Sequence, residues 1–308
     1  MLPDEVARII ADRCPGWAAE TVEFLGEGDF FTAYLVNGGW VFRFAKHAEA
    51  AASLHREAYL LPQLADRLDL RIPSPQVVSV DARPELIAYP LLPGPELMPE
   101  NYLRLAEPER ERCAGQLATF LRQLHAIDPA PARACGVEER DYRARYGDVL
   151  ERARRHLFGR LHEPQRSFVE REVATYLASD EPSSYTPVLL HGDLSPGHVL
   201  YDPRAGLLTG VIDFGDVMIG DPAWDLVFIY EDYGLDFLAR LLPRYTGADP
   251  RPLLARTYRF YLLDMIEWAV RSAEDASPEL GDAVAELSRV TASREQDFGE
   301  LMAACAAS

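Results

Sequence analysis

Two acidic motifs carry the residue types that phosphoryl transfer from a nucleotide requires. Residues 191–193 read HGD and residues 213–216 read DFGD, and each motif follows an apolar run. The reaction needs a carboxylate that orients the attacking hydroxyl and accepts its proton, and ligands that hold Mg²⁺ against the phosphates. Asp193 suits the first role and Asp213 suits the second.

His198 stands where the catalytic loop of kinases carries a metal-binding asparagine. Mg²⁺ prefers oxygen ligands, so an imidazole requires a weaker nitrogen contact or a bridging water. We expect the apolar runs 188–190 and 207–212 to pair as a β-hairpin, because each leads to one of the two carboxylates. This pairing would place the side chains of Asp193, His198 and Asp213 together at one end of the hairpin. The complete set favours a metal and proton-transfer site over isolated turn and loop residues.

The segments HGDLSPGHVL and GVIDFGDVMIGDPAWDL resemble the catalytic core of the aminoglycoside phosphotransferase family, small-molecule kinases that share the protein-kinase fold. The histidine and the FGD ending are most similar to the aminoglycoside 2″-phosphotransferases and the macrolide phosphotransferases. The resemblance implies that Asp193 is the catalytic base and that His198 and Asp213 are the magnesium ligands. It covers most of the chain and is least specific in the substrate-facing C-terminal part.

The resemblance also implies an α+β fold of the two-lobe, protein-kinase-like type. Residues 1–90 would form an N-terminal nucleotide-binding lobe with a small antiparallel five-stranded sheet and a helix. Residues 91–95 would form a hinge, and residues 96–308 a larger, mostly helical lobe for catalysis and substrate binding.

Hydrophobic periodicity predicts the elements of the first lobe. Helices are expected over 2–14 and 48–67, where apolar residues recur at helical spacing. The turn 37–39 reads NGG and needs the positive φ that asparagine and glycine tolerate. The expected strands are 22–28, 31–36, 40–45, 77–80 and 85–88.

The turn between the first two expected strands reads GEGDFF and resembles the glycine-rich loop that covers nucleotide phosphates. Phe31 occupies the place of the third glycine of that loop. The resemblance assigns Gly26 and Gly28 to the nucleotide site. A tight β-turn without a ligand is the alternative.

A cation on the third strand of a kinase pairs with a carboxylate on the next helix and holds the nucleotide phosphates. Arg43 stands where the family often has lysine, and Glu57 falls on the following helix. Arginine suits the role because its planar guanidinium fork matches phosphate geometry and stays charged. Lys46 is the second candidate, although an ideal strand would direct it to the opposite face.

The stretch 89–95 reads YPLLPGP and continues neither a helix nor a strand, because three prolines and a glycine interrupt it. By resemblance it is the hinge whose backbone meets the purine, with Tyr89 and Leu91 in the nucleotide site. Ordinary hydrophobic packing of Tyr89 is the alternative.

From residue 107 onward the periodicity is helical almost throughout. One helix is expected to end at His125, which we interpret as a packed or capping histidine. Asp221 precedes a proline at a helix start and is interpreted as an N-cap, and Asp225 as an anchor of the catalytic loop. The remaining expected helices are 142–158, 165–177, 224–233, 236–245, 253–270 and 280–298.

Acidic residues recur where the family builds its acceptor pocket. They are Asp216, Glu231, Asp232, Asp264 and Glu267, and Trp268 stands beside them. A polyamine substrate needs carboxylates to offset the desolvation of its ammonium groups, and an indole ring provides a cation–π contact. Carboxylates on helices that simply face water are the alternative.

The chain has 308 residues, of which 48% are hydrophobic, and a formal net charge of −18. This charge argues against nucleic acid or an anionic membrane as a partner and favours a cationic ligand, although solubility alone explains it equally well. No apolar run reaches membrane length and the N-terminus does not read as a secretory signal, so we expect a cytoplasmic protein. Four cysteines without paired or metal-binding spacing are expected to be free thiols, namely Cys14, Cys113, Cys135 and Cys305.

Together these features predict a monomeric small-molecule kinase that uses Mg²⁺ and ATP or GTP. Its expected acceptor is a hydroxyl of a cationic antibiotic, in the first place an aminoglycoside. The alternatives are a macrolide phosphotransferase, a metabolic kinase of choline, homoserine or a sugar, and an inactive nucleotide-binding regulator. The unusual residues Phe31, Arg43 and His198 favour the regulator, whereas the retained Asp193 and Asp213 argue against it.

Overall fold

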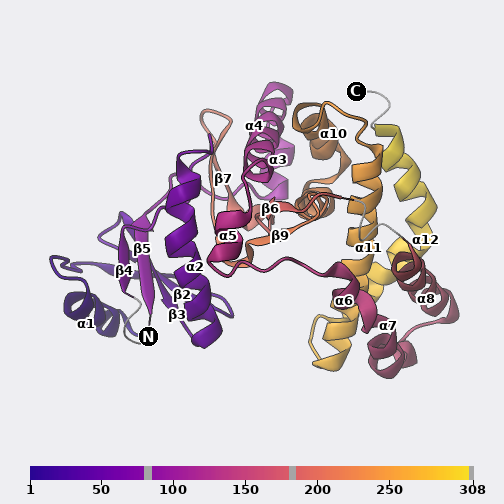
Figure 1. Cartoon of the computed structure of the whole chain (residues 1–308), viewed down its shortest axis with the longest axis horizontal. Coiled ribbons are helices and arrows are strands. Elements are labelled where there is room, and N and C mark those ends of the chain that lie inside the picture. The colour runs from indigo at the N-terminus through magenta and orange to yellow at the C-terminus, as the bar shows by residue number, and fades with distance from the viewer. Residues whose placement is uncertain (80–84, 180–184, 305–308) are drawn as a thin grey trace. The chain divides into compact units, whose positions relative to one another are not determined.

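The computed structural model describes three stretches of the chain, residues 1–79, 85–179 and 185–304. The chain forms two compact units, each built from two separate stretches of sequence (Figure 1). Unit 1 comprises Met1–Glu138 and His191–Val217, and unit 2 comprises Glu139–Leu190 and Met218–Ser308. The lobe and hinge limits at residues 90 and 95 stay a prediction from sequence.

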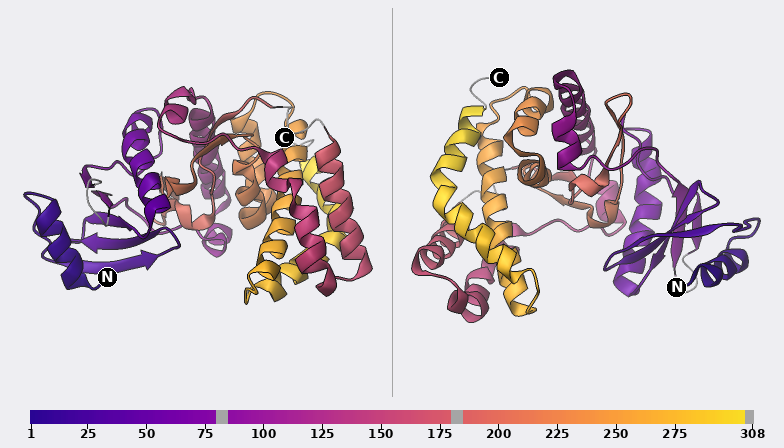
Figure 2. Two further views of the ribbon diagram at one scale, coloured as in Figure 1. Left: turned by 60° about the horizontal axis from the view of Figure 1, so that its bottom comes forward. Right: turned by 180° about the vertical axis from the view of Figure 1, so that it is seen from behind.

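A five-stranded antiparallel sheet forms the N-terminal part of unit 1, as predicted (Figure 2). Its strands are β1 (Val22–Glu27), β2 (Phe31–Val36), β3 (Trp40–Ala45), β4 (Val77–Ser79) and β5 (Leu86–Pro90), in the order β1-β2-β3-β5-β4. Asn37 (φ 53°) and Gly38 (φ 64°) make the predicted left-handed turn between β2 and β3. Val80, the expected end of the fourth strand, lies outside the described residues.

Two helices pack against this sheet, α1 (Pro3–Arg13) on one face and α2 (Ala48–Ala65) on the other. Ile10 of α1 packs in one cluster with Phe42 of β3, and Leu54 of α2 packs in a second cluster with Val41. Because successive side chains of a strand alternate between its faces, Arg43 shares the α2 face with Val41. The sheet therefore directs a charged side chain toward α2.

The remaining helices and strands of unit 1 are α3 (Pro99–Arg104), α4 (Glu107–His125), α5 (Ala130–Ala134), β7 (Val199–Asp202) and β8 (Leu207–Val211). The predicted pairing of runs 188–190 and 207–212 is wrong. β8 pairs with β7, which is only a short turn away along the chain, so that Val199 lies opposite Val211. The earlier run forms β6 (Val188–Leu190), which pairs with β9 (Met218–Gly220) in unit 2.

The segment that follows β5 is fixed on the β7–β8 hairpin. The Tyr201 N–H donates to Pro95 O (2.9 Å), and the Thr209 hydroxyl donates to Pro93 O (2.5 Å). Gly94 has a φ of 105°, and a Cβ at this position would lie 2.3 Å from Tyr201 O. Glycine is therefore required here, and the segment has a defined path.

Unit 2 is mostly helical. Its α-helices are α6 (Tyr142–Gly147), α7 (Val149–Arg152), α8 (Glu163–Ala178), α9 (Asp225–Phe228), α10 (Gly234–Tyr245), α11 (Arg251–Glu274) and α12 (Leu280–Ala304). The prediction of one helix over 142–158 is wrong. The first helix ends at Gly147, α7 follows, and the chain then forms a π-helical turn, Ala153–Leu157. A second π-helical turn, Ile229–Tyr233, replaces the C-terminal half of the expected helix 224–233.

Two buried carboxylates join elements of unit 2. Glu172 of α8 is 1% exposed and accepts from Arg259 of α11 and from Arg294 of α12, each at 2.8 Å. Asp221 is fully buried, accepts a backbone N–H in the turn before α9, and accepts from Arg256 of α11 at 2.6 Å. Burial without a partner is costly for a carboxylate, so these pairs fix the helices that carry them.

Among the described residues, no helix combines the length and the apolar character that crossing a membrane requires. Cys14 and Cys113 are buried, Cys135 is partly buried, and all three are free thiols as predicted. Burial raises the pKa of Cys113 to about 11, which keeps this thiol protonated at neutral pH. Cys305 lies outside the described residues.

Candidate active site

Asp193 lies in a loop that holds its carboxylate from two sides. The Ser195 N–H donates to Asp193 Oδ1 (3.1 Å), and His198 Nδ1 lies 3.6 Å from Asp193 Oδ2. A 3₁₀ turn, Pro196–His198, returns the imidazole to the loop, where Nδ1 lies 2.9 Å from Asp193 O. The Asp193 side chain remains 31% exposed, so an acceptor hydroxyl has access to it.

His191 joins this loop to the strand end that precedes Asp213. Its ring is fully buried, Nδ1 accepts from the Asp193 N–H (3.3 Å), and Nε2 donates to Ile212 O (3.0 Å). These two contacts select the neutral tautomer that carries its proton on Nε2. The ring also lies 4.6 Å from the Phe214 ring. Sequence reasoning gave His191 no role, and its place in the HGD motif was the signal available.

Asp213 adopts a left-handed backbone conformation, with φ 59° and ψ 76°, directly after Ile212. Its Oδ1 accepts from the Gly215 N–H (3.3 Å), a local bond that stabilises this conformation in a residue other than glycine. Burial alone would raise the pKa of the Asp213 carboxyl, but the Arg43 guanidinium and the Gly215 N–H hold it below its usual value. Asp213 is therefore ionised at neutral pH. The following 3₁₀ turn ends at Asp216, a predicted acceptor residue, whose side chain is exposed.

His198 and Asp213 direct acceptor atoms to one place. Nε2 of His198 lies 3.7 Å from Asp213 Oδ2. The Nδ1–H of His198 donates to the Asp193 carbonyl, so in the neutral imidazole Nε2 carries a lone pair. A nitrogen lone pair beside a carboxylate oxygen fits a divalent cation whose other ligands are water and phosphate oxygens. The described residues offer no group of three or more His, Cys, Asp or Glu side chains for a metal ion.

Arg43 connects α2 to Asp213. Its Nη1 donates to Glu57 Oε2 (2.6 Å), its Nη2 donates to Asp213 Oδ1 (3.1 Å), and its side chain is only 6% exposed. Burial raises the pKa of Glu57 to about 7; Arg43 opposes this shift and Asp213 adds to it. The structure thus brings together Arg43 and Glu57, which the sequence paired, and adds a bond to Asp213 that the sequence did not indicate.

Two further side chains lie next to Arg43, Glu57 and Asp213. Tyr89 of β5 is 6% exposed and lies on the α2 face of the sheet, diagonal to Arg43. Burial raises the pKa of Tyr89 to about 12, so the phenol is neutral. The Ser53 hydroxyl of α2 donates to Gly215 O (3.2 Å). Helix α2 therefore contacts both the guanidinium and the turn after Asp213, and no sequence motif indicated Ser53.

The glycine-rich segment forms a tight turn. The Gly28 N–H donates to Phe31 O (3.0 Å), and Lys46 donates to Gly28 O (2.9 Å) and lies 2.7 Å from Glu27 Oε1. Lys46 thus stabilises the turn, while Arg43 binds the buried carboxylate of Glu57 and the carboxylate of Asp213. A Cβ at Gly26 or Gly28 would meet no atom within 4 Å. The fold itself therefore does not require these glycines, and close approach of a ligand stays the predicted reason for them.

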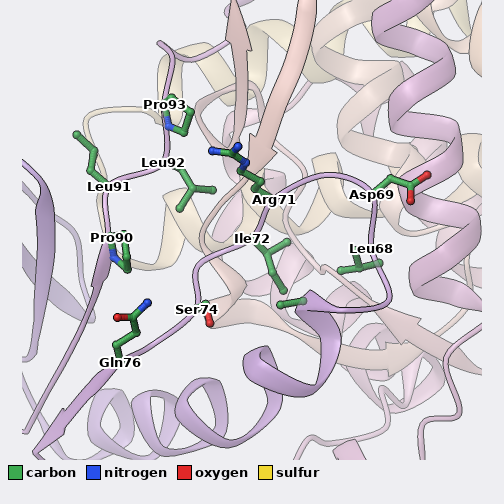
Figure 3. A pocket seen from close by; sticks show the side chains of 11 residues that line it. Leu68, Asp69, Arg71, Ile72, Ser74, Gln76, Pro90, Leu91, Leu92 and Pro93 are labelled. Atoms are coloured by element: carbon green, nitrogen blue, oxygen red, sulfur yellow. The ribbon is translucent and has the colours of Figure 1, made fainter.

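A cavity of about 260 Å³ lies beside the segment that follows β5 (Figure 3). Leu91 and Leu92 line it on one side and Arg71 and Ile72 on the other, and Figure 3 shows Leu92 pointing toward Arg71 and Ile72. The Leu91 N–H donates to Gly39 O (2.9 Å), so this amide is already bonded within the protein. None of the predicted catalytic and metal residues lines the cavity.

Glu231 is the predicted acceptor residue with an open carboxylate. It is exposed, and within the described residues no hydrogen bond or ion pair engages its side chain. It lies in the π-helical turn Ile229–Tyr233, a rare geometry that is frequent at functional sites. Desolvation by the surrounding protein and the carboxylates of Asp232, Asp264 and Glu286 raise the pKa of Glu231 to about 7. A bound cation would relieve this repulsion.

Three other predicted acceptor residues are already engaged within unit 2. Arg145 of α6 lies 3.0 Å from Asp264 Oδ1 and 2.8 Å from Glu267 Oε2. Trp268 donates from Nε1 to Glu279 Oε2 (3.2 Å). A cationic ligand at Asp264 or Glu267 therefore shares these carboxylates with Arg145.

Comparison with known proteins gives a consistent result. The model of the family described as "Phosphotransferase enzyme family" matches residues 21–261. Viomycin phosphotransferase of Streptomyces vinaceus is 31% identical over 207 residues, which cover 65% of this chain and 69% of that protein. An aminoglycoside 3′-phosphotransferase of Streptomyces ribosidificus is 26% identical over 244 residues, which cover 70% of this chain and 88% of that protein.

Solved structures extend the similarity to nearly the whole chain. The GDP and kanamycin complex of APH(2″)-IIIa has a TM-score of 0.84 at 29% identity and covers 96% of this chain and 99% of its own. A macrolide 2′-phosphotransferase of type I has a TM-score of 0.71 at 25% identity and covers 93% of this chain and 99% of its own.

Proposed function

The chain belongs to the phosphotransferase enzyme family, and on that premise we propose that it transfers the γ-phosphoryl group of ATP or GTP to a hydroxyl of a cationic antibiotic, in the first place an aminoglycoside. The observation that carries the proposal is that Asp193 and Asp213 lie on either side of the His198 imidazole, while Arg43 is bonded to the same Asp213. Two carboxylates, an imidazole and a guanidinium thus lie together, which supports the roles of base, metal ligands and phosphate-binding cation proposed for them.

Asp193 is the base of the proposed reaction. The Ser195 N–H orients one carboxylate oxygen. The Nδ1–H of His198 donates to the Asp193 carbonyl and not to the carboxylate, so the carboxylate stays free to accept a proton. It aligns the acceptor hydroxyl and takes its proton as the new oxygen–phosphorus bond forms. At the same time the bond between the γ-phosphorus and the bridging oxygen breaks, and the nucleoside diphosphate leaves.

His198 and Asp213 are the residues that would hold Mg²⁺, which when bound neutralises charge on the phosphoryl group. Arg43 supplies a second, permanent positive charge. Glu57 holds one edge of its guanidinium, so that the other edge is directed to the place where Asp213 and the phosphates meet. The proposed nucleotide contacts on the sheet and linker are Gly26, Gly28, Tyr89 and Leu91.

Glu231 supports a cationic acceptor, because its carboxylate is exposed and already repelled by three neighbouring carboxylates. An ammonium group of the substrate would restore the charge balance. Asp216, Asp232, Asp264, Glu267 and Trp268 are the other proposed acceptor contacts. The reaction belongs in the cytoplasm, where nucleoside triphosphates are available and cysteines remain reduced.

Relatives that act on antibiotics support this choice of acceptor. The similar proteins include aminoglycoside and viomycin phosphotransferases, and the similar APH(2″)-IIIa structure is a complex with GDP and kanamycin. The type I macrolide 2′-phosphotransferase supports the alternative of a larger, more apolar acceptor.

The test is a coupled assay of nucleoside diphosphate release with Mg²⁺ and either ATP or GTP. The acceptors are kanamycin, viomycin, a macrolide, choline and homoserine. We expect stimulation by kanamycin and its loss in Asp193→Asn, with nucleotide binding retained. Stimulation by the macrolide alone would support the alternative acceptor class. Nucleotide binding without turnover on any acceptor would reject an antibiotic kinase and favour a regulator.

A further inference from the structure

Phe31 covers one face of the Arg43 guanidinium. The Arg43 Cζ lies 4.1 Å from the centroid of the Phe31 ring. Phe31 lies opposite Ala45 and Arg43 lies opposite Ala33, so the two side chains are diagonal neighbours on the α2 face of β2 and β3. The register of the sheet therefore produces this cation–π contact.

The same ring reaches the turn that follows Asp213. A Cβ built on Gly215 would lie 3.6 Å from Phe31 Cε2 and 3.9 Å from Arg43 Nη2. The ring is thus adjacent both to the guanidinium and to the turn whose carboxylate the guanidinium binds. A glycine in place of Phe31 would leave this side of Arg43 uncovered.

The edges of the guanidinium are held by charge and its face by the ring. Glu57 binds Nη1 and Asp213 binds Nη2, and the Arg43 side chain is 6% exposed. These edge contacts fix the direction of the fork, whereas stacking fixes the tilt of its plane. A lysine has no plane to orient. Phe31 and Arg43 are therefore complementary departures from the kinase pattern, one in the glycine-rich loop and one on the third strand.

We propose that Phe31 is a positioning residue for phosphoryl transfer, which acts by stacking on Arg43 and holding the guanidinium plane in line with Asp213. This inference rests on the proposed function. Loss of a cation–π contact with a desolvated guanidinium should slow the step that depends on the contact by about tenfold.

A double-mutant cycle tests the proposal in steady-state kinetics. The variants are Phe31→Leu, Phe31→Tyr, Arg43→Lys and Phe31→Leu/Arg43→Lys. We expect Phe31→Leu to lower kcat/KM for the nucleotide about tenfold, Phe31→Tyr to stay within about twofold of wild type, and Phe31→Leu to have no further effect beside Arg43→Lys. An equal loss from Phe31→Leu in both backgrounds would overturn the proposal.

Phe30→Leu is the matched control. The Phe30 ring lies 5.1 Å from the His47 ring and 6.0 Å from the Phe31 ring and is 38% exposed, so this variant removes the phenyl group next to Phe31 but keeps the ring that stacks on Arg43. It should retain wild-type kinetics. A loss equal to that of Phe31→Leu would show that the turn needs two aromatic residues for reasons other than Arg43, and would also overturn the proposal.

Urea unfolding of the same variants separates this inference from the proposed function. If wild type transfers no phosphoryl group, the proposed function fails, but unfolding still measures the Phe31–Arg43 contact without a nucleotide. The cycle should show coupling between the two sites, with Phe31→Tyr close to wild type. Zero coupling would overturn the inference whatever the kinetic result.

Discussion

Arg43 Nη2 lies 3.1 Å from Asp213 Oδ1, which joins two residues that are 170 positions apart in the sequence. The same guanidinium binds Glu57 of α2 at 2.6 Å. One buried cation therefore compensates two carboxylates, and Asp213 keeps its second oxygen directed to His198. Bound phosphates would compete with Asp213 for the Arg43 guanidinium. A metal ion on Asp213 would then supply the positive charge that this carboxylate no longer receives from Arg43.

Arg43→Met should strongly destabilise unit 1. The substitution keeps a long apolar stem but leaves Glu57, which is 1% exposed, and Asp213 without their cation. Removal of one partner from a buried ion pair costs about 3 kcal/mol or more. Urea unfolding measures this loss. Lys46→Met is the control, because the exposed Lys46–Glu27 pair should contribute less than about 1 kcal/mol; equal losses would contradict the argument.

Asp193→Asn should lower kcat by about 10³-fold, because the amide keeps the shape of the side chain but cannot accept the proton of the acceptor. The bond from the Ser195 N–H to the side-chain oxygen is retained in this variant. Nucleotide affinity should therefore stay unchanged in a direct binding measurement. A kcat within tenfold of wild type would remove Asp193 from the role of base.

His198→Ala should raise the Mg²⁺ concentration needed for half-maximal activity by at least about tenfold, because it removes the nitrogen that faces Asp213 Oδ2. His198→Asn should recover part of this loss, since an amide oxygen is also a Mg²⁺ ligand. A titration of activity with Mg²⁺ measures both effects. His125→Ala, at the end of α4, is the control. An unchanged requirement in His198→Ala would exclude His198 as a ligand.

Glu231 should make acceptor binding depend on pH. Its pKa is raised from 4.5 to about 7, so the carboxylate is largely protonated at pH 6 and ionised at pH 8. The KM for kanamycin should therefore be higher at pH 6 than at pH 8 in wild type, and this part of the pH profile should be absent in Glu231→Gln. Glu295→Gln, an exposed position on α12, should keep the wild-type profile.

The same shift predicts a stability effect that needs no substrate. A carboxyl whose pKa is raised on folding stabilises the protein fully below its unfolded pKa, here 4.5, and this contribution is lost as the pH rises through about 7. Glu231→Gln should therefore match wild type in thermal unfolding at low pH and exceed it at pH 8. A variant that is less stable than wild type at pH 8 would contradict the raised pKa.

Local patterns were sufficient to predict the sheet. The alternation in β2, the apolar run of β3 and the turn at Asn37 and Gly38 depend on neighbours in sequence, and these strands have the predicted bounds. The hairpin was mispredicted because Val199–Asp202 and Val188–Leu190 are both short apolar runs that precede β8 in the sequence. Either run could have been the pairing partner of β8. Pattern alone does not rank such partners, whereas loop length favours the nearer one.

The sequence predicted the residues of the site better than their contacts. Asp193, His198 and Asp213 follow from motif spacing, but the Arg43–Asp213 bond depends on tertiary packing. Glu231 was one of five acidic candidates with equal claims. Only the structure distinguishes it from Asp264, which Arg145 engages, because burial and pairing of a carboxylate on a helix cannot be read from helical spacing.

Gly94→Ala should destabilise unit 1 by about 3 kcal/mol, since a Cβ would lie 2.3 Å from Tyr201 O and the φ of 105° strains any residue other than glycine. Gly147→Ala is the matched control. A Cβ there meets no atom within 4 Å, and alanine should be neutral or stabilise by up to about 1 kcal/mol. Urea unfolding compares the two variants.

The kinetic effect of Gly94→Ala tests whether the linker positions the site. Tyr201 belongs to β7, which begins directly after His198, and β7 pairs with β8, which leads to Asp213. A displaced Tyr201 should therefore shift His198 relative to Asp213 and raise the Mg²⁺ requirement in folded protein at low temperature. If the folded variant keeps wild-type Mg²⁺ dependence, the linker stabilises the hairpin without positioning the metal ligands, and the two roles are separable.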